Sequence, residues 1–416
     1  MNKIIIIYFL ISFAFSSYKI IIPMDAYQTN HLKAYGVSFY SLKKNIKVDW
    51  LLNYRGGSFL VDFSNRIERE CMLKNVYFEK LSIEEISIIY SLIEENNMEI
   101  VTLDKAPRIA VYSPPNQQPW DDAVTLALTY ADIKYDVIFD EEVMNNKLYD
   151  YDWLHLHHED FTGQYGKFYK YRNKDWYLDM KSEFNSTAAK YGFKSVHKLK
   201  KFIALKIKNY ISDGGFLFAM CSATDSFDIA LSYYTTDFVH HIYDNSPIDD
   251  EYQSKVNYNN GVAFENYDLI VDPTIYEYSN IDYPPSNNPM TRSAESDYFT
   301  LSNFSAKWEP VPSMLTQNHV QNINGFMGQT TGYNKEFIKN HIVILGEDLY
   351  SDQVKYIHGN IGKGTFTFLG GHDPEDYRHF VGDPPTELDL HRSSPGYRLI
   401  LNNILFPAAK KKSKKT

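Results

Sequence analysis

The sequence predicts an α/β protein in which helices cover both faces of a parallel sheet and a small α/β unit precedes that sheet. From residue 106 onward, short apolar strands alternate with amphipathic helices, which is typical of parallel βαβ units. The segment 216–220 (FLFAM) is apolar throughout, as expected for a strand buried on both faces. The order Lys105-Ala106-Pro107 interrupts the pattern, so we place the boundary between the two units there.

Composition narrows the class of protein further. The chain has 416 residues, 44% of them hydrophobic, so it has the material for a real core. Its net charge of −10 argues against a general nucleic-acid partner, which needs a basic face to neutralise phosphates. Two cysteines are too few for a disulfide-stapled scaffold or a four-cysteine metal site.

Residues 1–17 have the layout of a secretory signal peptide. Lys3 precedes an apolar run, and Ala14-Phe15-Ser16 supplies small residues at the −3 and −1 positions of a cleavage site. The run is shorter than the roughly 20 residues that a membrane-spanning helix needs. We therefore expect an exported protein (periplasmic or secreted) without stable membrane insertion after cleavage.

Residues 18–105 form the predicted small N-terminal unit. Residues 18–24 and 48–54 read as strands, and residues 82–96 read as a helix that begins at the cap residue Ser82. The second strand ends in Arg55-Gly56-Gly57. An arginine beside free backbone N–H groups can bind an anion, and the same residues also suit a plain turn with a solvated arginine.

Residues 106–408 form the predicted main domain. Its expected strands and helices are 108–112, 120–131 (helix, with Asp121 and Asp122 near its positive end), 135–139, 153–157, 196–211 (helix), 216–220, 341–345, 364–369 and 395–405 (helix). Residues 235–334 are rich in Asn, Tyr, Asp and Pro with weak periodicity, and we interpret them as a long insertion over the sheet. Residues 409–416 form a basic tail that we expect to be disordered.

Ligands of parallel sheets bind outside the carboxyl ends of the strands, so the residues that follow the strands are the candidates for a site. Cys221 directly follows the strand 216–220 and precedes a predicted helix. A helix N-terminus lowers the pKa of a thiol, and its free N–H groups can hold an oxyanion. A buried, inert cysteine is the alternative.

Gly370-Gly371-His372 follows the strand 364–369, and acidic residues come directly after it. A histidine with an adjacent carboxylate is a suitable general base. The alternative is a turn histidine among solvated acids. Because parallel strands end at one edge, we expect Cys221 and His372 to share a crevice.

These residues together resemble the class I glutamine amidotransferase-like superfamily over about residues 107–407. The resemblance implies a flavodoxin-like sheet, with Cys221 as nucleophile, His372 as base and Glu375 as the nearest match to the acid. Two features depart from the family pattern. Ala219 and Ala223 replace the usual glycines, and the His-to-Glu spacing is one residue longer, which leaves Asp373 and Asp376 as competing acids.

The whole chain also resembles exported bacterial proteins labelled asparagine synthetase B. The residues argue against that activity. An asparagine synthetase of that type needs an N-terminal cysteine nucleophile, whereas Asn2 occupies position 2, and it needs a Ser-Gly-Gly-x-Asp-Ser pyrophosphate loop, which is missing.

A dense polar cluster follows the predicted strand 153–157. It consists of His155, His157, His158, Glu159 and Asp160. Alternate histidines on a strand share a face and can bind zinc, with an acid completing the site. Contact with substrate is the interpretation we favour for His157, His158 and Glu159, and packing in the core is the third possibility.

The sequence thus predicts an exported, thiol-dependent amide hydrolase without a cofactor or metal, acting on a small-molecule, peptide or glycan ligand. In this hypothesis Cys221 attacks a carbonyl, His372 accepts its proton, Glu375 orients the imidazole, and N–H groups around Ser222 bind the oxyanion. The alternatives are a catalytically inactive module that binds a sugar or small metabolite, and metal-dependent chemistry at the His155 cluster. A Cys71–Cys221 disulfide would abolish the thiol chemistry.

Overall fold

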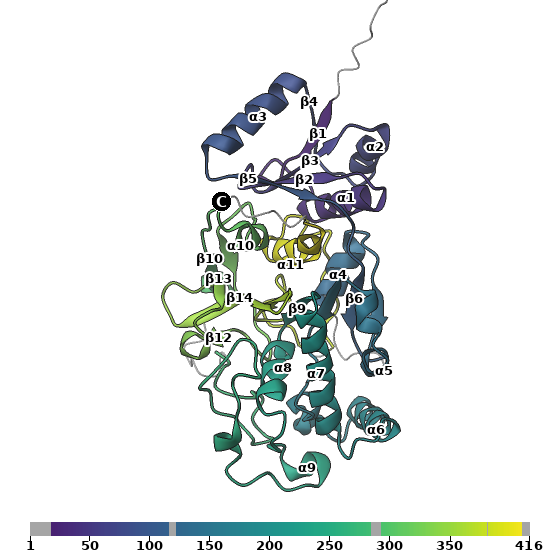
Figure 1. Cartoon of the computed structure of the whole chain (residues 1–416), viewed down its shortest axis with the longest axis vertical. Helices are drawn as coiled ribbons and strands as arrows, with labels where there is room; N and C mark the ends of the chain where they lie inside the picture. Colours follow the sequence, from purple (N-terminus) through teal and green to yellow (C-terminus); the bar gives the residue numbers. More distant parts are fainter. Residues whose placement is uncertain (1–17, 116–121, 284–292, 381, 410–416) are drawn as a thin grey trace, which may run out of the picture.

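The structure is a computed structural model that describes residues 18–115, 122–283, 293–380 and 382–409. The predicted signal peptide, the basic tail from Lys410 onward, and Trp120 and Asp121 of the predicted helix 120–131 lie outside these residues. Figure 1 shows the N-terminal unit at one end of the long axis, with the larger unit and its long irregular segment below it. No helix in the described ranges is long and apolar enough to cross a bilayer.

The N-terminal unit contains a five-stranded antiparallel sheet with the order β4-β1-β3-β2-β5. Its elements are β1 (Lys19–Ile22), α1 (His31–Lys43), β2 (Val48–Leu52), β3 (Ser58–Asp62), α2 (Asn65–Leu73), β4 (Glu79–Leu81), α3 (Ile83–Glu95) and β5 (Glu99–Leu103). The predicted cap is confirmed: Ser82 and Glu85 form a reciprocal capping box at the start of α3.

The two faces of this sheet have different partners. Ile86, Ile89 and Ile93 recur along α3 at helical spacing and pack on one face. The opposite face packs against α1, and this core continues without interruption into that of the larger unit. The N-terminal unit is therefore joined to the rest of the chain through buried apolar contacts.

The larger unit is built on a ten-stranded mixed sheet with the order β11-β10-β13-β14-β15-β9-β8-β6-β7, and β12 pairs with β14. The strands are β6 (Ile109–Tyr112), β7 (Asp136–Ile138), β8 (Trp153–Leu156), β9 (Phe216–Met220), β10 (Tyr298–Leu301), β11 (Asn322–Asn324), β12 (Tyr333–Asn334), β13 (Val343–Glu347), β14 (Gln353–Ile361) and β15 (Gly364–Leu369).

The strands from β7 to β15 in that order run parallel, as predicted, but the sheet does not end there. β14, β13, β10 and β11 extend it with antiparallel pairs. The strand β14 was not predicted, because the polar residues Lys355 and His358 interrupt the apolar run expected of a central strand. An all-parallel sheet is therefore wrong, and a mixed sheet with a parallel half is correct.

Helices cover both faces of the parallel half. α4 (Ala123–Tyr130) and α11 (Pro395–Leu405) share one core with β6 and β9, whereas α7 (Val196–Ser212) and α8 (Ser222–Ser232) pack on the opposite face. The remaining α-helices are α5 (Asp140–Met144), α6 (Asp175–Lys190), α9 (His241–Asp244) and α10 (Pro310–Leu315). Most strand residues are buried on both faces, which explains their apolar runs.

The segment 235–334, predicted to be an insertion over the sheet, also contributes strands to it. Its β10, β11 and β12 pair into the sheet, and α9 and α10 lie between irregular stretches. The weak apolar periodicity of the segment follows from the shortness of these elements.

Candidate functional site

The carboxyl ends of β8 and β15 bring histidines from distant parts of the chain to one edge of the larger sheet. His157 directly follows β8, and His372 follows β15 after two glycines. β9 pairs in parallel with both strands, so all three end at this edge. The ring centroids of His157 and His372 lie 4.3 Å apart.

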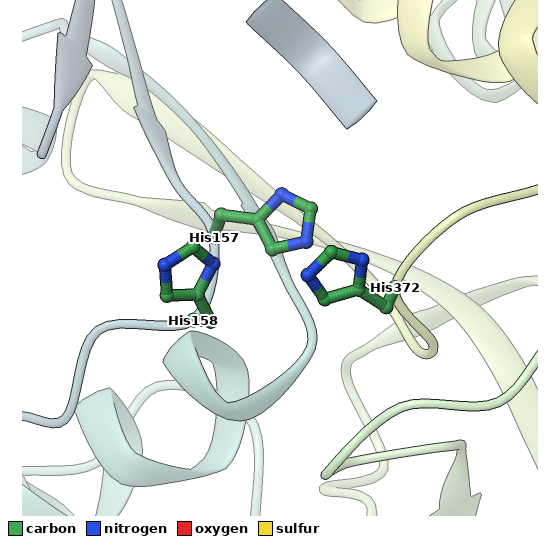
Figure 2. A group of neighbouring side chains, drawn as sticks. All are labelled: His157, His158 and His372. Carbon is green, nitrogen blue, oxygen red and sulfur yellow. The ribbon is translucent and has the colours of Figure 1, made fainter. Parts of the chain in front are cut away.

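His158 completes a group of three buried imidazoles. One ring nitrogen from each of His157, His158 and His372 lies within 4.8 Å of the others. Figure 2 shows His157 and His158 leaving the end of one strand while His372 approaches from a separate segment, with the ring of His157 next to that of His372. Zn–N bonds are about 2.0–2.1 Å, so small ring rotations would bring three such nitrogens onto one ion.

Burial lowers the pKa values of two of these imidazoles, those of His158 and His372. Burial, followed by the neighbouring imidazoles of His157 and His158, lowers the pKa of His372 well below its usual value. Burial and His157 lower the pKa of His158 in the same direction. A neutral imidazole presents a lone pair, so His158 and His372 are suited to bind a metal without losing protons.

Asp122 lies on the far side of His157. Its carboxylate is 3.4 Å from Nδ1 of His157 and 3.2 Å from Nε2 of His155. Burial raises the pKa of Asp122, but His155 and His157 outweigh burial and hold that pKa well below its usual value. A carboxylate against one ring nitrogen leaves the other as the ligand. Nε2 of His157 is buried and has no hydrogen-bond partner among the described residues.

His379 extends the histidine group on the other side. Its ring stacks on His372 with centroids 4.6 Å apart, and its Nδ1 lies 2.9 Å from a carboxylate oxygen of Asp376. Asp376, His379 and Asp383 form a further cluster of possible metal ligands. Of the acids after β15, Asp376 is therefore the one linked to His372, because it contacts His379, whose ring stacks on that of His372.

Glu375, the predicted third member of a triad, has a different partner. Its carboxylate lies 2.9 Å from Nδ1 of His391. The carboxylate of Asp373 accepts hydrogen bonds from Thr386 and Tyr397. The loop after β15 turns these two acids toward their own neighbours, so the expected pairing of Glu375 with His372 is replaced by a Glu375–His391 pair.

Cys221 has the backbone of a strained elbow but a covered thiol. Its φ of 50° is unusual for a residue other than glycine, and it joins β9 to α8. The thiol is buried, and the Gln329 N–H lies 3.3 Å from Sγ. Burial raises the pKa of Cys221 to about 11, although N–H groups of Thr330, Gln329 and Ser222 oppose that rise. Cys221 and Cys71 are both free, so the disulfide is not formed.

The residues Met327, Gly328 and Gln329 lie between Cys221 and His372. The N–H of His372 donates to the carbonyl of Met327, and Gly328 packs against the backbone of Gly371 and His372. A side chain at Gly328 would contact that backbone at 3.0 Å. The insertion therefore supplies the strip of chain that covers the thiol, and the predicted crevice shared by Cys221 and His372 holds backbone at this point.

A small cavity of about 40 Å³ adjoins the histidines. Its walls include His158, Glu159, Phe168, Trp176 and Lys200. The carboxylate of Glu159 accepts a hydrogen bond from the His157 N–H, and burial raises the pKa of Glu159 to about 8. A cavity of this size holds a few water molecules next to the histidines and is too small for an organic ligand.

The predicted anion site at Arg55-Gly56-Gly57 is a joint between the two units. The guanidinium of Arg55 pairs with Asp25 at 2.6 Å and with Glu79 at 2.9 Å. The carbonyl of Gly56 accepts from buried Arg398, and Gly57 packs on Gln317. These groups have structural partners and lie apart from the histidines at the end of β8. A cavity of about 440 Å³ between the units opens near Arg108 and Phe216, at the opposite ends of the strands.

Of the three candidate ligands, His157 and His158 were predicted as part of one polar cluster and His372 as a general base. Asp122 was predicted only to interact with a helix dipole, and neither His379 nor His391 was predicted to belong to a site. The spacing of Asp376 and His379, i and i+3, was the signal available for that pair.

The fold and site define a mixed α/β protein with a buried histidine centre at the carboxyl edge of its parallel strands. No family model matches the chain, and no curated protein matches it. Two cytoplasmic proteins from Salmonella typhimurium are similar at 10% and 12% identity; each comparison covers 73% of this chain, with 100% and 99% of those chains and TM-scores of 0.35 and 0.34. A beta-galactosidase from Bacillus circulans sp. alkalophilus is similar at 10% identity over 66% of this chain and 29% of its own, with a TM-score of 0.28.

Proposed function

We propose that the protein is a metal-dependent hydrolase whose ion is held by His157, His158 and His372. The observation that carries this proposal is the convergence of three buried imidazoles from two separated strand ends. Nitrogen-only ligands favour Zn²⁺ over hard cations. Three protein ligands leave a fourth position open, which is the arrangement of catalytic rather than structural zinc.

The arrangement of the parallel strands supports a flavodoxin-like classification. Numbered along the chain, β7-β6-β8-β9-β15 has the order 2-1-3-4-5. Sheets of this order bind ligands where the order reverses, here between β6 and β8. His157 follows β8, and Asp122 follows β6, so the histidine centre occupies that place. The resemblance to glutamine amidotransferase-like proteins fits the same order and stays part of the proposal.

Each residue has a role in the proposed hydrolysis of an amide. A divalent ion held by His157, His158 and His372 would supply a water of lowered pKa. Glu159, in its ionised form, would accept one proton from the attacking water and pass it to the leaving nitrogen, so that the amide and the water give a carboxylic acid and an amine. Asp122 is a positioning residue that holds the ring of His157.

The test combines metal content with turnover. The full chain, stripped with a chelator and reloaded with Zn²⁺, is assayed on a panel of chromogenic amides and esters, and bound metal is measured by mass spectrometry. Glu159→Gln should keep the zinc and lose at least about 100-fold in kcat. The exposed Glu251→Gln is the matched control. Equal turnover with and without metal, or no stoichiometric zinc, would contradict the proposal.

Thiol-dependent hydrolysis by Cys221 is the second candidate. The elbow backbone of Cys221 and the three N–H groups around its sulfur favour it. It requires the strip containing Gln329 to move off the thiol. Activity that survives metal removal but disappears in Cys221→Ser, together with rapid alkylation of Cys221 by iodoacetamide, would select it over the metal mechanism. Stoichiometric metal and ligand binding without turnover would instead identify an inactive binding module.

Export is proposed on the layout of residues 1–17 alone. Expression of the whole chain with its natural start, followed by N-terminal sequencing of the exported protein, should give a first residue near Ser17. A chain that keeps Met1 and stays inside the cell would contradict it.

A further inference from the structure

A second group of metal-binding side chains lies directly behind the three-histidine centre. One carboxylate oxygen of Asp122 and one ring nitrogen each of His155 and His157 lie within 4.8 Å of one another. Nε2 of His155 is 3.2 Å from one oxygen of Asp122, and Nδ1 of His157 is 3.4 Å from the other. Both imidazoles are 0% exposed. Two histidines with one carboxylate are a ligand set that zinc uses in proteins.

The ring of His155 has the orientation of a metal ligand. Its Nδ1 lies 3.1 Å from the carbonyl of Phe218. A carbonyl only accepts, so Nδ1 carries the proton and, in the neutral ring, Nε2 presents its lone pair to Asp122. Metal-bound histidines use their second nitrogen in this way. A lone pair and a carboxylate oxygen that face each other at 3.2 Å repel unless a cation, either a metal ion or a second ring proton, lies between them.

The surrounding contacts hold these ligand atoms in place. The ring of His155 stacks on those of Trp153 and Phe218, with interplanar angles of 15° and 26°. The oxygen of Asp122 that faces His157 also accepts hydrogen bonds from two N–H groups in the first turn of α4, at 2.6 and 3.0 Å. The carboxylate and the imidazole are therefore fixed by partners other than each other, as the ligands of a preformed metal site are.

The spacing of the ligand atoms suits zinc. Zn–N bonds of 2.0–2.1 Å place the ligand atoms of a tetrahedral ion about 3.3–3.4 Å apart. The two nitrogen-to-oxygen separations, 3.2 and 3.4 Å, agree with that value without any movement of the rings. Because two of the three ligands are imidazole nitrogens, the group favours zinc over the hard cations that prefer oxygen.

We infer that Asp122, His155 and His157 form a second zinc site, next to the three-histidine centre. The inference rests on the proposed function in one respect: His157 would serve both ions, with Nε2 toward the first and Nδ1 toward the second. His157 must release its remaining ring proton to bind both, so the second ion is held more weakly and is lost on gel filtration. Opposite nitrogens of one ring hold two ions too far apart to share a water as two-metal hydrolases do, so the second ion fixes the ring of His157.

The experiment counts zinc at equilibrium on the full chain, by native mass spectrometry and by competition with a chromogenic chelator. The wild type should bind two ions, the second at least about tenfold more weakly than the first. His155→Asn keeps an N–H donor for the carbonyl of Phe218 but has no atom in the place of Nε2. This variant should bind one ion with unchanged affinity. His241→Gln, which replaces an exposed histidine, is the control and should bind two.

His155→Gln keeps the test decisive if His155→Asn does not fold, because its amide can donate to Asp122 and is a poor zinc ligand. A single ion that His155→Asn retains and His372→Ala loses overturns the inference and leaves the proposed function intact. A second ion that both His155 variants retain also overturns the inference. A single ion that the His155 variants lose and His372→Ala retains supports this site and contradicts the ligand set of the proposed function. A wild type that binds no zinc overturns both.

Discussion

Two pairs of packed histidines in this protein have the same spacing between their rings, but His31 and His157, one from each pair, differ in their hydrogen bonds. His157 and His372 at the sheet edge, and His31 and His319 at the joint between the units, each have ring centroids 4.3 Å apart. At the joint, both nitrogens of His31 are within hydrogen-bond distance of Ser393 or the carbonyls of Met24 and Asp25.

His319 is satisfied in a similar way, because its Nδ1 lies 2.9 Å from the guanidinium of Arg398. Arginine only donates, so this nitrogen accepts and the ring is neutral. In contrast, Nε2 of His157 has no described partner, and its Nδ1 faces Asp122. Proximity of imidazoles is therefore not enough to define a metal site. The difference is that both ring nitrogens of His31 have hydrogen-bond partners, whereas Nε2 of His157 has none among the described residues.

The largest expected effect is a difference in zinc content between variants of the two histidine pairs. His372→Ala removes one of three ligands and should abolish stoichiometric zinc binding, because two imidazoles hold zinc weakly. His319→Ala, the matched change at the joint, should retain one zinc per chain. Metal content after gel filtration checks both variants. Equal zinc content in His372→Ala and His319→Ala would contradict the assignment of His372 as a zinc ligand.

The next effect concerns the carboxylate behind His157. Asp122→Asn keeps the shape but removes the charge that holds the ring, so zinc affinity should fall by roughly 10–100-fold. Competition with a chromogenic chelator measures this change. Asp389→Asn, an exposed carboxylate at the joint, provides the control. An unchanged affinity in Asp122→Asn would mean that His157 is not a ligand.

A smaller effect is expected from pH at the joint. Burial, then the charge of Arg398 and the neighbouring imidazole of His319, lowers the pKa of His31 to about 2. The unfolded chain takes up this proton below about pH 6.5 and the folded chain does not, so stability is complete above pH 6.5 and is lost as pH falls. Between pH 6.5 and 5 the loss is at most about 2 kcal/mol for one histidine.

His31→Gln removes that titration, so its free energy of unfolding should fall less steeply over the same pH range. Urea denaturation at pH 7.5, 6.5, 5.5 and 5.0 measures both slopes. Parallel slopes in the variant and the wild type would show that His31 does not keep its lowered pKa in solution.

The smallest expected effect is on stability, and it compares a buried hydroxyl that has a hydrogen-bond partner with one that has none described. Ser222 and Ser41 are both buried, but the Ser222 hydroxyl has no described partner, whereas that of Ser41 donates to the carbonyl of Val37 at 2.9 Å. Ser222→Ala should leave stability unchanged or slightly higher. Ser41→Ala should cost about 0.5–1.5 kcal/mol. A large loss in Ser222→Ala would reveal a partner such as an ordered water.

The elements that the sequence predicted best are those with strong local signals. The helix 395–405 is observed with the same bounds as α11, and the strand 216–220 is β9. Gly370 and Gly371 marked the turn that carries His372 to the sheet edge. The antiparallel strands β10, β11 and β14 were harder, because pairing across the sheet, rather than an apolar run, makes them strands.

The residues of the candidate site were predicted from the sequence, but which of them lie next to each other was not. His157, His158 and His372 were all named from their positions after strands, but the base was expected to face Cys221. Strand direction brought both residues to one edge, as expected. What separates their roles is the strip with Gln329, whose position nothing in the local pattern around 326–331 indicates.

The sequence by itself determined the alternation of strands and helices and the chemical character of the residues after each strand, because periodicity and turn residues act over a few positions. The tertiary structure alone decided which of those residues meet. The ring of His157 faces the carboxylate of Asp122, and the thiol of Cys221 is covered by chain more than 100 residues away. Buried polar groups take whichever partner the packed core supplies, and that choice is global.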